Sequence, residues 1–256
     1  MGLYLDESLA ASYSSRSQKI RIMTETWLAG RMFCPCCGHD SLTKLPNNRP
    51  VADMRCDACG EIFELKSKAG RLGKKIAAGA YGAMIERIQS NSNPHLLILQ
   101  YALNLAVTAL TLVPKFFFAP AAIEKRRPLA ATARRAGWTG CNILYERIPP
   151  QGKIPVVLDG RFRTAAEVRA SYVQAARLTS ENIDDRGWLF DVLNCVNEIA
   201  EDEFALEDLY RFEARLQRLH ANNRNVRAKI RQQLQSLRDR GVVEFLERGH
   251  YRKSAL

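Results

Sequence analysis

The chain has 256 residues, of which 46% are hydrophobic and 25% are charged, as in an ordinary globular protein rather than a disordered chain. Its length permits one large domain, or a medium domain with a small one attached. The formal net charge of +11 is less ordinary and favours a polyanionic partner, either nucleic acid or an anionic membrane surface.

The N-terminal residues and the cysteines indicate the compartment. Residues 1–20 contain no basic segment followed by an apolar run, so they lack the pattern of a signal peptide. We therefore expect a cytoplasmic protein with reduced thiols. The chain has seven cysteines, and the close spacing of five of them favours metal binding over disulfides in such a compartment.

Two helices are predicted on either side of the clustered cysteines. Residues 1 to about 30 are predicted to be helical, because residues 17–32 have apolar residues at spacings of three and four, and a second helix is predicted over 72–89 despite its glycines. Residues 34–68 between them carry the clustered cysteines and several acidic residues. That segment therefore holds the candidate chemistry.

An uncharged stretch over residues 96–113 is long enough to raise the question of a membrane span. It contains four polar residues, prolines at positions 94 and 114 bracket it, and it divides into two β-rich runs around residues 102–105. We therefore expect two buried strands and no membrane segment.

A loop, a hairpin and a helix are predicted next along the chain. Residues 124–141 are basic and contain proline and glycine, which is typical of a loop. Residues 154–161 have the pattern of a hairpin that turns at Asp159-Gly160. Residues 164–178 have the apolar spacing of a helix.

The composition changes around residues 180–187, a polar and turn-rich stretch that predicts a linker. Three runs with helical spacing follow it, over residues 188–200, 205–219 and 225–241, and then two short strands around Arg248-Gly249. Helix, helix, helix and hairpin is the order of a winged-helix domain. We therefore predict a large domain over residues 1–181 and a winged helix over 182–256.

Charge is divided unevenly within the predicted winged helix. Residues 186–213 contain two basic and eight acidic residues, whereas residues 214–253 contain eleven basic and three acidic residues. The basic part covers the third helix and the wing, which are the parts that such a fold lays on DNA. A small helical protein-interaction domain with a solvated basic face is the alternative.

The third helical run carries side chains that can pair with bases. Arginine can bind guanine and glutamine can bind adenine through two hydrogen bonds in the major groove. A helix presents only one face to DNA, so some of these residues will cover the core or face solvent instead. The candidate DNA-binding residues here are Arg224, Arg227, Lys229, Arg231 and Gln232.

Two C-x-x-C pairs predict a structural zinc site. Cys34 and Cys37 are separated by 18 residues from Cys56 and Cys59, which is the spacing of a tetrahedral zinc ribbon. Four thiolates complete the coordination of Zn²⁺ and leave no open position. Cys36 could compete as a ligand, although the two-residue spacing favours Cys37.

Glu64 and Lys66 flank Leu65 in the apolar segment that follows the second C-x-x-C pair. Alternation in a strand puts Glu64 and Lys66 on one face, and Asp53 lies eleven positions earlier. If Asp53 lies on the neighbouring strand, two carboxylates can share a Mg²⁺ ion, which lowers the pKa of a bound water. This is the PD-(D/E)xK nuclease pattern. A solvated strand face is the alternative.

Four segments resemble the DpnI family of methyl-directed type II restriction endonucleases: NNRPVAD at 47–53, FELKSK at 63–68, RRAGWTGCNI at 134–143 and KIRQQLQ at 229–235. The resemblance implies a mixed α/β (α+β) PD-(D/E)xK core with an inserted zinc site, followed by a winged helix. It also implies Mg²⁺-dependent cleavage of double-stranded DNA at G-A-T-C carrying N6-methyladenine.

Carried over by motif, Asp53, Glu64 and Lys66 would be catalytic, and the Leu65 backbone carbonyl would join the two carboxylates in binding Mg²⁺. The four cysteines would hold Zn²⁺.

The segment RRAGWTG offers a second candidate for reading DNA. Arg134 and Arg135 suit phosphates, and Trp138 between two glycines could present its ring to a base or a methyl group. A core tryptophan that anchors the loop is the alternative. The resemblance favours the DNA role.

Two functions therefore compete on the sequence. One is a monomeric, cytoplasmic restriction endonuclease that needs Mg²⁺ and recognises N6-methyladenine. The other is a non-catalytic zinc and winged-helix DNA-binding regulator, in which the acidic residues and lysine are incidental.

Overall fold

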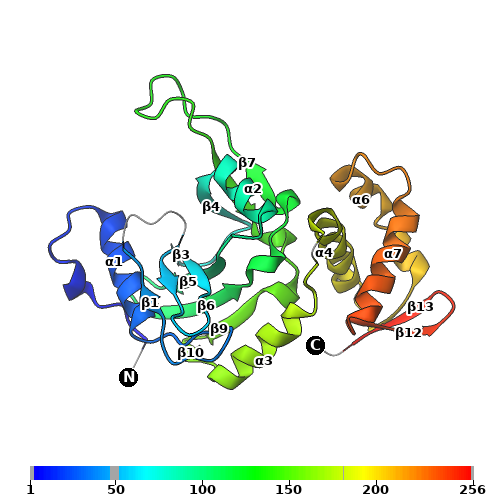
Figure 1. Cartoon of the computed structure of the whole chain (residues 1–256), viewed down its shortest axis with the longest axis horizontal. Coiled ribbons are helices and arrows are strands. Elements are labelled where there is room, and N and C mark those ends of the chain that lie inside the picture. Colours follow the sequence, from blue (N-terminus) through cyan, green and yellow to red (C-terminus); the bar gives the residue numbers. More distant parts are fainter. Residues whose placement is uncertain (1–2, 47–51, 181, 255–256) are drawn as a thin grey trace. The chain divides into compact units, whose positions relative to one another are not determined.

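The computed structural model describes residues 3–46, 52–180 and 182–254. Figure 1 shows its helices and strands, coloured along the sequence. The chain divides into two compact units, each built from several stretches. The first unit comprises residues 1–73, 91–115 and 152–175, and the second comprises residues 74–90, 116–151 and 176–256. The second unit thus groups the C-terminal region with two earlier stretches, whereas the predicted domain boundary was a single cut near residue 181.

A seven-stranded mixed sheet forms the centre of the first unit, in the order β1-β2-β3-β5-β6-β9-β10. β3 and β5 are parallel and the other neighbours are antiparallel. The strands are β1 (Thr43–Lys44), β2 (Met54–Arg55), β3 (Ile62–Ala69), β5 (His95–Tyr101), β6 (Val107–Val113), β9 (Ile154–Leu158) and β10 (Arg161–Phe162).

The uncharged stretch over residues 96–113 forms the middle of this sheet, as predicted. It supplies most of β5 and all of β6, which pair with each other as an antiparallel hairpin. Leu96, Leu97, Ile98 and Leu99 are all buried, because a strand covered on both faces needs apolar residues throughout. Among the described residues, no helix has the length and apolarity that crossing a membrane requires.

The predictions of an N-terminal helix, of a hairpin and of the helix after it are also confirmed in outline. The N-terminal α-helix α1 (Arg16–Ala29) begins at Arg16, whereas helix was predicted from the start of the chain. It packs against β1 and β3, and Trp27 on it stacks on Phe162. The hairpin of β9 and β10 turns at Asp159 and Gly160, which have φ of +49° and +69°. Such a turn suits the twist of a hairpin. The helix α3 (Ala165–Ala176) follows, and a short 3₁₀ helix η1 (Glu7–Ala10) precedes α1.

A three-stranded antiparallel sheet in the second unit corrects two predictions. Its order is β4 (Lys75–Ala80), β8 (Gly140–Leu144) and β7 (Ile123–Lys125). The helix α2 (Tyr81–Gln89) therefore starts at Tyr81 rather than near residue 72, because residues 75–80 pair with β8. The loop predicted over residues 124–141 is likewise shorter, because its first residues belong to β7 and its last residues to β8. Short 3₁₀ helices are η2 (Lys115–Phe117), η3 (Pro120–Ala122), η4 (Tyr145–Arg147) and η5 (Pro150–Gly152).

The C-terminal region has the predicted winged-helix order with refinements. Its helices are α4 (Ile183–Glu198), α5 (Leu206–Tyr210), α6 (Glu213–Leu219) and α7 (Val226–Asp239), and its strands are β11 (Glu203–Ala205), β12 (Val243–Glu247) and β13 (His250–Lys253). The strands form a sheet in the order β11-β13-β12. The predicted second helix is two helices, because the chain turns at residues 211–212, and α4 starts inside the predicted linker.

Candidate active site and DNA-binding surface

Four cysteines of the first unit converge on one point. The sulfur atoms of Cys34, Cys37, Cys56 and Cys59 all lie within 4.8 Å of one another. The Sγ–Sγ distances are 3.7 Å between Cys34 and Cys59 and 3.6 Å between Cys37 and Cys56. Four thiolates at about 2.3 Å from a tetrahedral Zn²⁺ are separated by about 3.8 Å, so this set fits a closed structural site.

The two C-x-x-C pairs have matching backbone geometry. Gly38 N donates to Cys34 O at 2.8 Å and Gly60 N donates to Cys56 O at 2.9 Å. Both glycines have positive φ, +85° and +76°, which a residue with a side chain adopts only with strain. The second loop joins β2 to β3, so this half of the metal site lies in the connection between Asp53, which directly precedes β2, and Glu64 and Lys66 on β3.

Cys36 lies outside the metal set. Its sulfur is 3.6 Å from His95 Nε2, on the central strand β5. His95 Nε2 also lies 3.2 Å from Glu61, which follows the second C-x-x-C pair. Lys115 completes this network, with its ammonium 2.8 Å from the Glu61 carboxylate. The network therefore links both cysteine loops to β5, and its members other than Cys36 were not found from the sequence.

Hydrogen bonding fixes the state of His95. The backbone N–H of Lys115 donates to Nδ1 at 3.1 Å, so Nε2 carries the proton and can donate to Glu61. Burial lowers the pKa of His95, which keeps the ring neutral near pH 7. The hydrogen bond from His95, and then the contact with Lys115, lower the pKa of Glu61 to about 2. Glu61 is therefore ionised and paired at neutral pH.

Asp53 sits where the pairing between β2 and β3 stops. Its N–H donates to Phe63 O and its C=O accepts from Leu45 N, both at 2.9 Å. Within the described residues, β3 beyond Phe63 has no strand partner on this edge. Asp53 Oδ2 instead accepts from the N–H of Leu65 at 2.7 Å. The N–H and C=O of a strand residue point to the same edge, so the Leu65 carbonyl also faces Asp53.

Glu64 and Lys66 lie together on the same stretch of β3. Lys66 Nζ is 2.6 Å from Glu64 Oε1, and both side chains are partly buried. Asp53 and Glu64 both line the pocket described below, and among the described residues the four cysteines are the one cluster of three or more His, Cys, Asp or Glu side chains close enough to share a metal ion. The strand therefore brings together Glu64 and Lys66, with Asp53 held beside Leu65.

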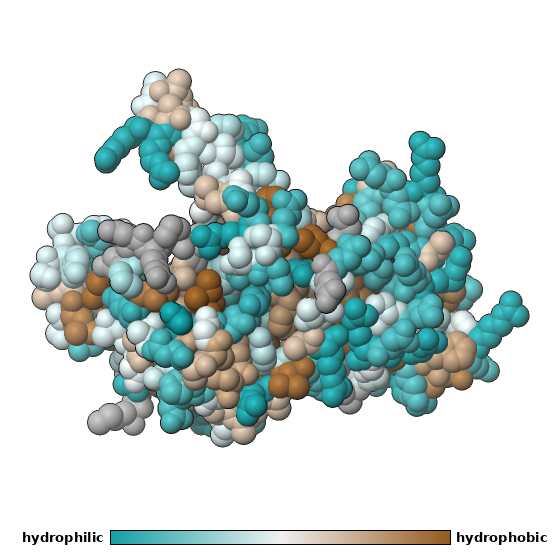
Figure 2. Space-filling model, in the orientation of Figure 1, coloured by the Kyte–Doolittle hydropathy of each residue, from teal (hydrophilic) through white to brown (hydrophobic). Residues whose placement is uncertain are grey.

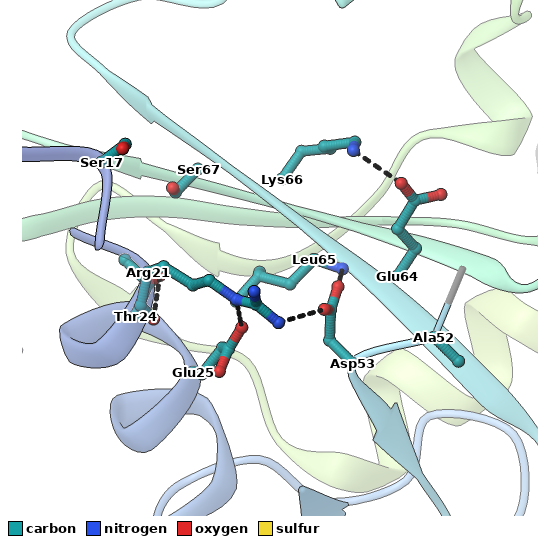
Figure 3. Close-up of a pocket in the computed structure, with 10 residues that line it drawn as sticks. All are labelled: Ser17, Arg21, Thr24, Glu25, Ala52, Asp53, Glu64, Leu65, Lys66 and Ser67. Carbon is teal, nitrogen blue, oxygen red and sulfur yellow. Dashed lines mark hydrogen bonds and ion pairs between the residues drawn. The ribbon is translucent and has the colours of Figure 1, made fainter. Parts of the chain in front are cut away.

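Helix α1 contributes charged residues that were not predicted. Arg21 Nε is 2.5 Å from Glu25, and its Nη2 is 3.8 Å from Asp53 Oδ1 (Figure 3). Glu25 is only 3% exposed, and Lys44 of β1 pairs with its other oxygen at 2.9 Å. The hydrogen bond with Glu25 raises the pKa of Arg21. Arginine and glutamate four positions apart on a predicted helix were the available signal.

These groups line one open pocket of about 480 Å³. Figure 3 shows Arg21 between Glu25 and Asp53, and Lys66 turned toward Glu64 on the strand above. The pocket is lined by Ser17, Arg21, Thr24, Glu25, Ala52, Asp53, Glu64, Leu65, Lys66 and Ser67. Residues 47–51, which hold most of the NNRPVAD segment, lie outside the described residues. The pocket combines carboxylate and carbonyl oxygens, which Mg²⁺ prefers, with two cations suited to a phosphate.

The predicted loop with Trp138 extends from the ends of β7 and β8 (Figure 1). Arg134 and Arg135 are exposed, and the guanidinium of Arg135 lies 5.0 Å from the centre of the Trp138 ring. Trp138 is half-buried against its own hairpin, where a Cβ on Gly140 would come within 2.8 Å of the indole. Trp138 is thus a hairpin residue rather than a core residue.

The predicted DNA-binding residues on α7, and Arg224 just before it, differ in their exposure. Arg224, Arg227, Arg231 and Gln232 are exposed. The side chain of Lys229 is only 18% exposed and pairs with Asp185 of α4 at 2.6 Å. The buried face consists of Val226, Ile230, Gln233, Leu234 and Leu237. The expectation that only part of this set faces outward is therefore confirmed.

Two known protein families match this chain, one over its N-terminal part and one over its C-terminal part. Residues 1–181 match the DpnI family, described as the Dam-replacing family, and residues 184–253 match the Dam-replacing helix-turn-helix domain of DpnI. The helix-turn-helix match supports DNA binding by the C-terminal region, and membership implies a restriction nuclease. With these two matches covering nearly all of its length, the chain belongs to the DpnI, Dam-replacing family.

Proposed function

We propose that the chain is a Mg²⁺-dependent type II restriction endonuclease that cleaves double-stranded DNA at G-A-T-C when the adenine is N6-methylated. The observation that carries the proposal is the segment of β3 beyond Phe63, where Asp53, Glu64 and Lys66 line one pocket. Family membership supports the same reaction class. We further propose that it acts as a monomer in the cytoplasm, with Zn²⁺ in the cysteine site.

The residues of the pocket would divide the work of phosphodiester hydrolysis, in which water forms a bond to phosphorus and a sugar oxygen leaves. Asp53, Glu64 and the Leu65 carbonyl would hold Mg²⁺, which supplies charge stabilisation and a water of lowered pKa. Lys66 would orient the attacking water and offset phosphate charge.

Methylation would be read by contacts to the added methyl group. N6-methylation removes one hydrogen-bond donor from adenine and adds an apolar group in the major groove. Trp138 offers a planar apolar surface, and Gln232 on α7 can contact an adenine edge. Two readers acting in sequence would multiply the modest discrimination that one methyl contact gives.

A plasmid digest tests this function. Purified protein would be incubated with Mg²⁺ and two plasmids, one methylated and one unmethylated at G-A-T-C. We expect cleavage of the methylated plasmid alone, and none without a divalent ion. Cleavage of neither plasmid would support a non-catalytic DNA-binding regulator, and equal cleavage of both would contradict methyl direction.

A further inference from the structure

Tyr210 and Glu213 hold two arginines of α7 in place. Arg227 Nε donates to Glu213 Oε2 at 2.7 Å, and its guanidinium carbon lies 4.8 Å from the centre of the Tyr210 ring. Arg231 Nη1 donates to the Tyr210 hydroxyl at 2.8 Å. Tyr210 ends α5 and Glu213 begins α6, so this Tyr210–Glu213 bracket comes from outside α7.

The bracket fixes the direction in which Arg227 can bind a partner. A guanidinium held through Nε keeps the edge formed by its two terminal nitrogens available. That edge matches two neighbouring acceptors in one plane, as O6 and N7 of guanine present them in the major groove. The ring of Tyr210 below the guanidinium restricts rotation out of this plane.

Neither folding stability nor general electrostatics accounts for the bracket. The side chains of Arg227 and Glu213 are 59% and 38% exposed, and a surface ion pair of this kind contributes little to folding. A carboxylate on a face that approaches phosphates also opposes binding to DNA of any sequence. The surface over the C-terminal helices in this view is mostly hydrophilic (Figure 2). Fixing the arginine before it binds lowers the entropy that binding must overcome.

We propose that Tyr210 and Glu213 are positioning residues for DNA recognition, which hold Arg227 so that its terminal nitrogens meet O6 and N7 of a guanine. The inference rests on the proposed function, because the G-A-T-C site supplies the guanine. Arg231 lies one turn further along α7, where its Nη1 donates to the Tyr210 hydroxyl.

Binding of full-length protein to fluorescent duplexes tests the bracket. Affinity would be measured without added Mg²⁺ for a methylated G-A-T-C duplex and for a scrambled duplex. We expect Glu213→Gln to weaken binding to the methylated duplex about tenfold, while binding to the scrambled duplex stays equal or tightens. If Glu213 acted only through its charge, the substitution would tighten binding to both duplexes.

Two controls connect the effect to Arg227 and guanine. Glu207→Gln removes another exposed carboxylate, from the first turn of α5, and should leave the discrimination unchanged. A duplex with 7-deazaguanine at the site lacks the N7 acceptor. Wild type should bind this duplex about tenfold more weakly than the normal site, whereas Arg227→Gln and Glu213→Gln should bind both alike.

The outcomes separate the bracket from the proposed function. If wild type and Glu213→Gln prefer the methylated duplex over the scrambled one equally, the proposed role of the bracket is wrong and the proposed function stands. Wild type without preference for the methylated duplex would overturn both, because no recognition would remain for Arg227 to serve. Tyr210→Phe, which keeps the ring and removes the bond to Arg231, should cost about two- to threefold in affinity.

Discussion

The pocket on β3 and the exposed face of α7 hold their charged groups in different ways. In the pocket, the backbone amide of Leu65 binds Asp53, and Arg21 pairs with a glutamate that is 3% exposed. On α7, Arg227 and Arg231 are held by side chains that remain partly exposed. Rigid, buried support suits chemistry, and exposed support suits recognition. Substitutions in the pocket should therefore have large effects, and those on α7 graded ones.

The largest expected effect belongs to Asp53. Asp53→Ala removes a metal-binding carboxylate and the acceptor of the Leu65 amide, so cleavage of methylated plasmid should fall at least about 10³-fold. Binding of the methylated duplex should be retained. Asp57→Asn, a change to an exposed carboxylate in the same connection, is the matched control and should cut normally. An Asp53→Ala protein that still cleaves the methylated plasmid would show that this pocket is not the catalytic site.

The metal site should be nearly as sensitive, through folding rather than chemistry. Cys56→Ser breaks the four-cysteine set, so bound zinc should fall well below about one ion per chain and the thermal midpoint should drop by roughly 10 °C. Cleavage should be lost with it. Elemental analysis and calorimetry measure both.

Cys36→Ser is the matched control for the metal site, because Cys36 contacts His95 rather than the metal set. It should keep its zinc and its activity. A well-folded and fully active Cys56→Ser protein would show that the connection between β2 and β3 does not need the metal.

Arg21 should have an intermediate effect. Its guanidinium lies beside Asp53 in the pocket, so Arg21→Gln should lower the cleavage rate at saturating DNA about 10- to 100-fold. Lys44 still pairs with Glu25, and the fold should persist. Arg16→Gln, at the exposed start of the same helix, should cut at the wild-type rate, and equal rates for both variants would exclude a role for Arg21.

The smallest effect concerns the network behind the cysteines. Lys115→Met removes one partner of Glu61 in a pair whose side chains are each 27% exposed, so chemical denaturation should show a loss of about 1 kcal/mol. Lys74→Met, from a pair in which the lysine is 82% exposed, should change stability by much less. Equal losses would mean that burial does not distinguish these pairs.

The sequence predicted what lies close together along the chain. The two C-x-x-C pairs, Glu64 with Lys66, and the central hairpin of β5 and β6 are all local patterns. Position 36 was ambiguous because spacing alone cannot say which of two adjacent thiols turns toward the metal. The structure resolves it through His95, 59 residues away.

The contacts that could not be predicted are those between distant residues. β4 was predicted as helix, because its alanines and glycine do not reveal pairing with β8, whose residues lie 60 to 69 positions later. Tyr210 and Glu213 carry no motif, and only the packing of α5 and α6 on α7 brings them to Arg227. Arg21 and Glu25 were visible as a helical pair, but not as neighbours of Asp53.

The central claim is that the pocket on β3 catalyses DNA cleavage and that α7 recognises the DNA sequence. Its most direct test measures single-turnover cleavage and equilibrium affinity on one methylated G-A-T-C duplex for two variants. Asp53→Ala should bind like wild type and not cut, whereas Arg227→Gln should bind about tenfold more weakly yet cut at the wild-type rate when the enzyme is saturating. An Asp53→Ala protein that still cuts, or an Arg227→Gln protein with unchanged affinity, would contradict this division.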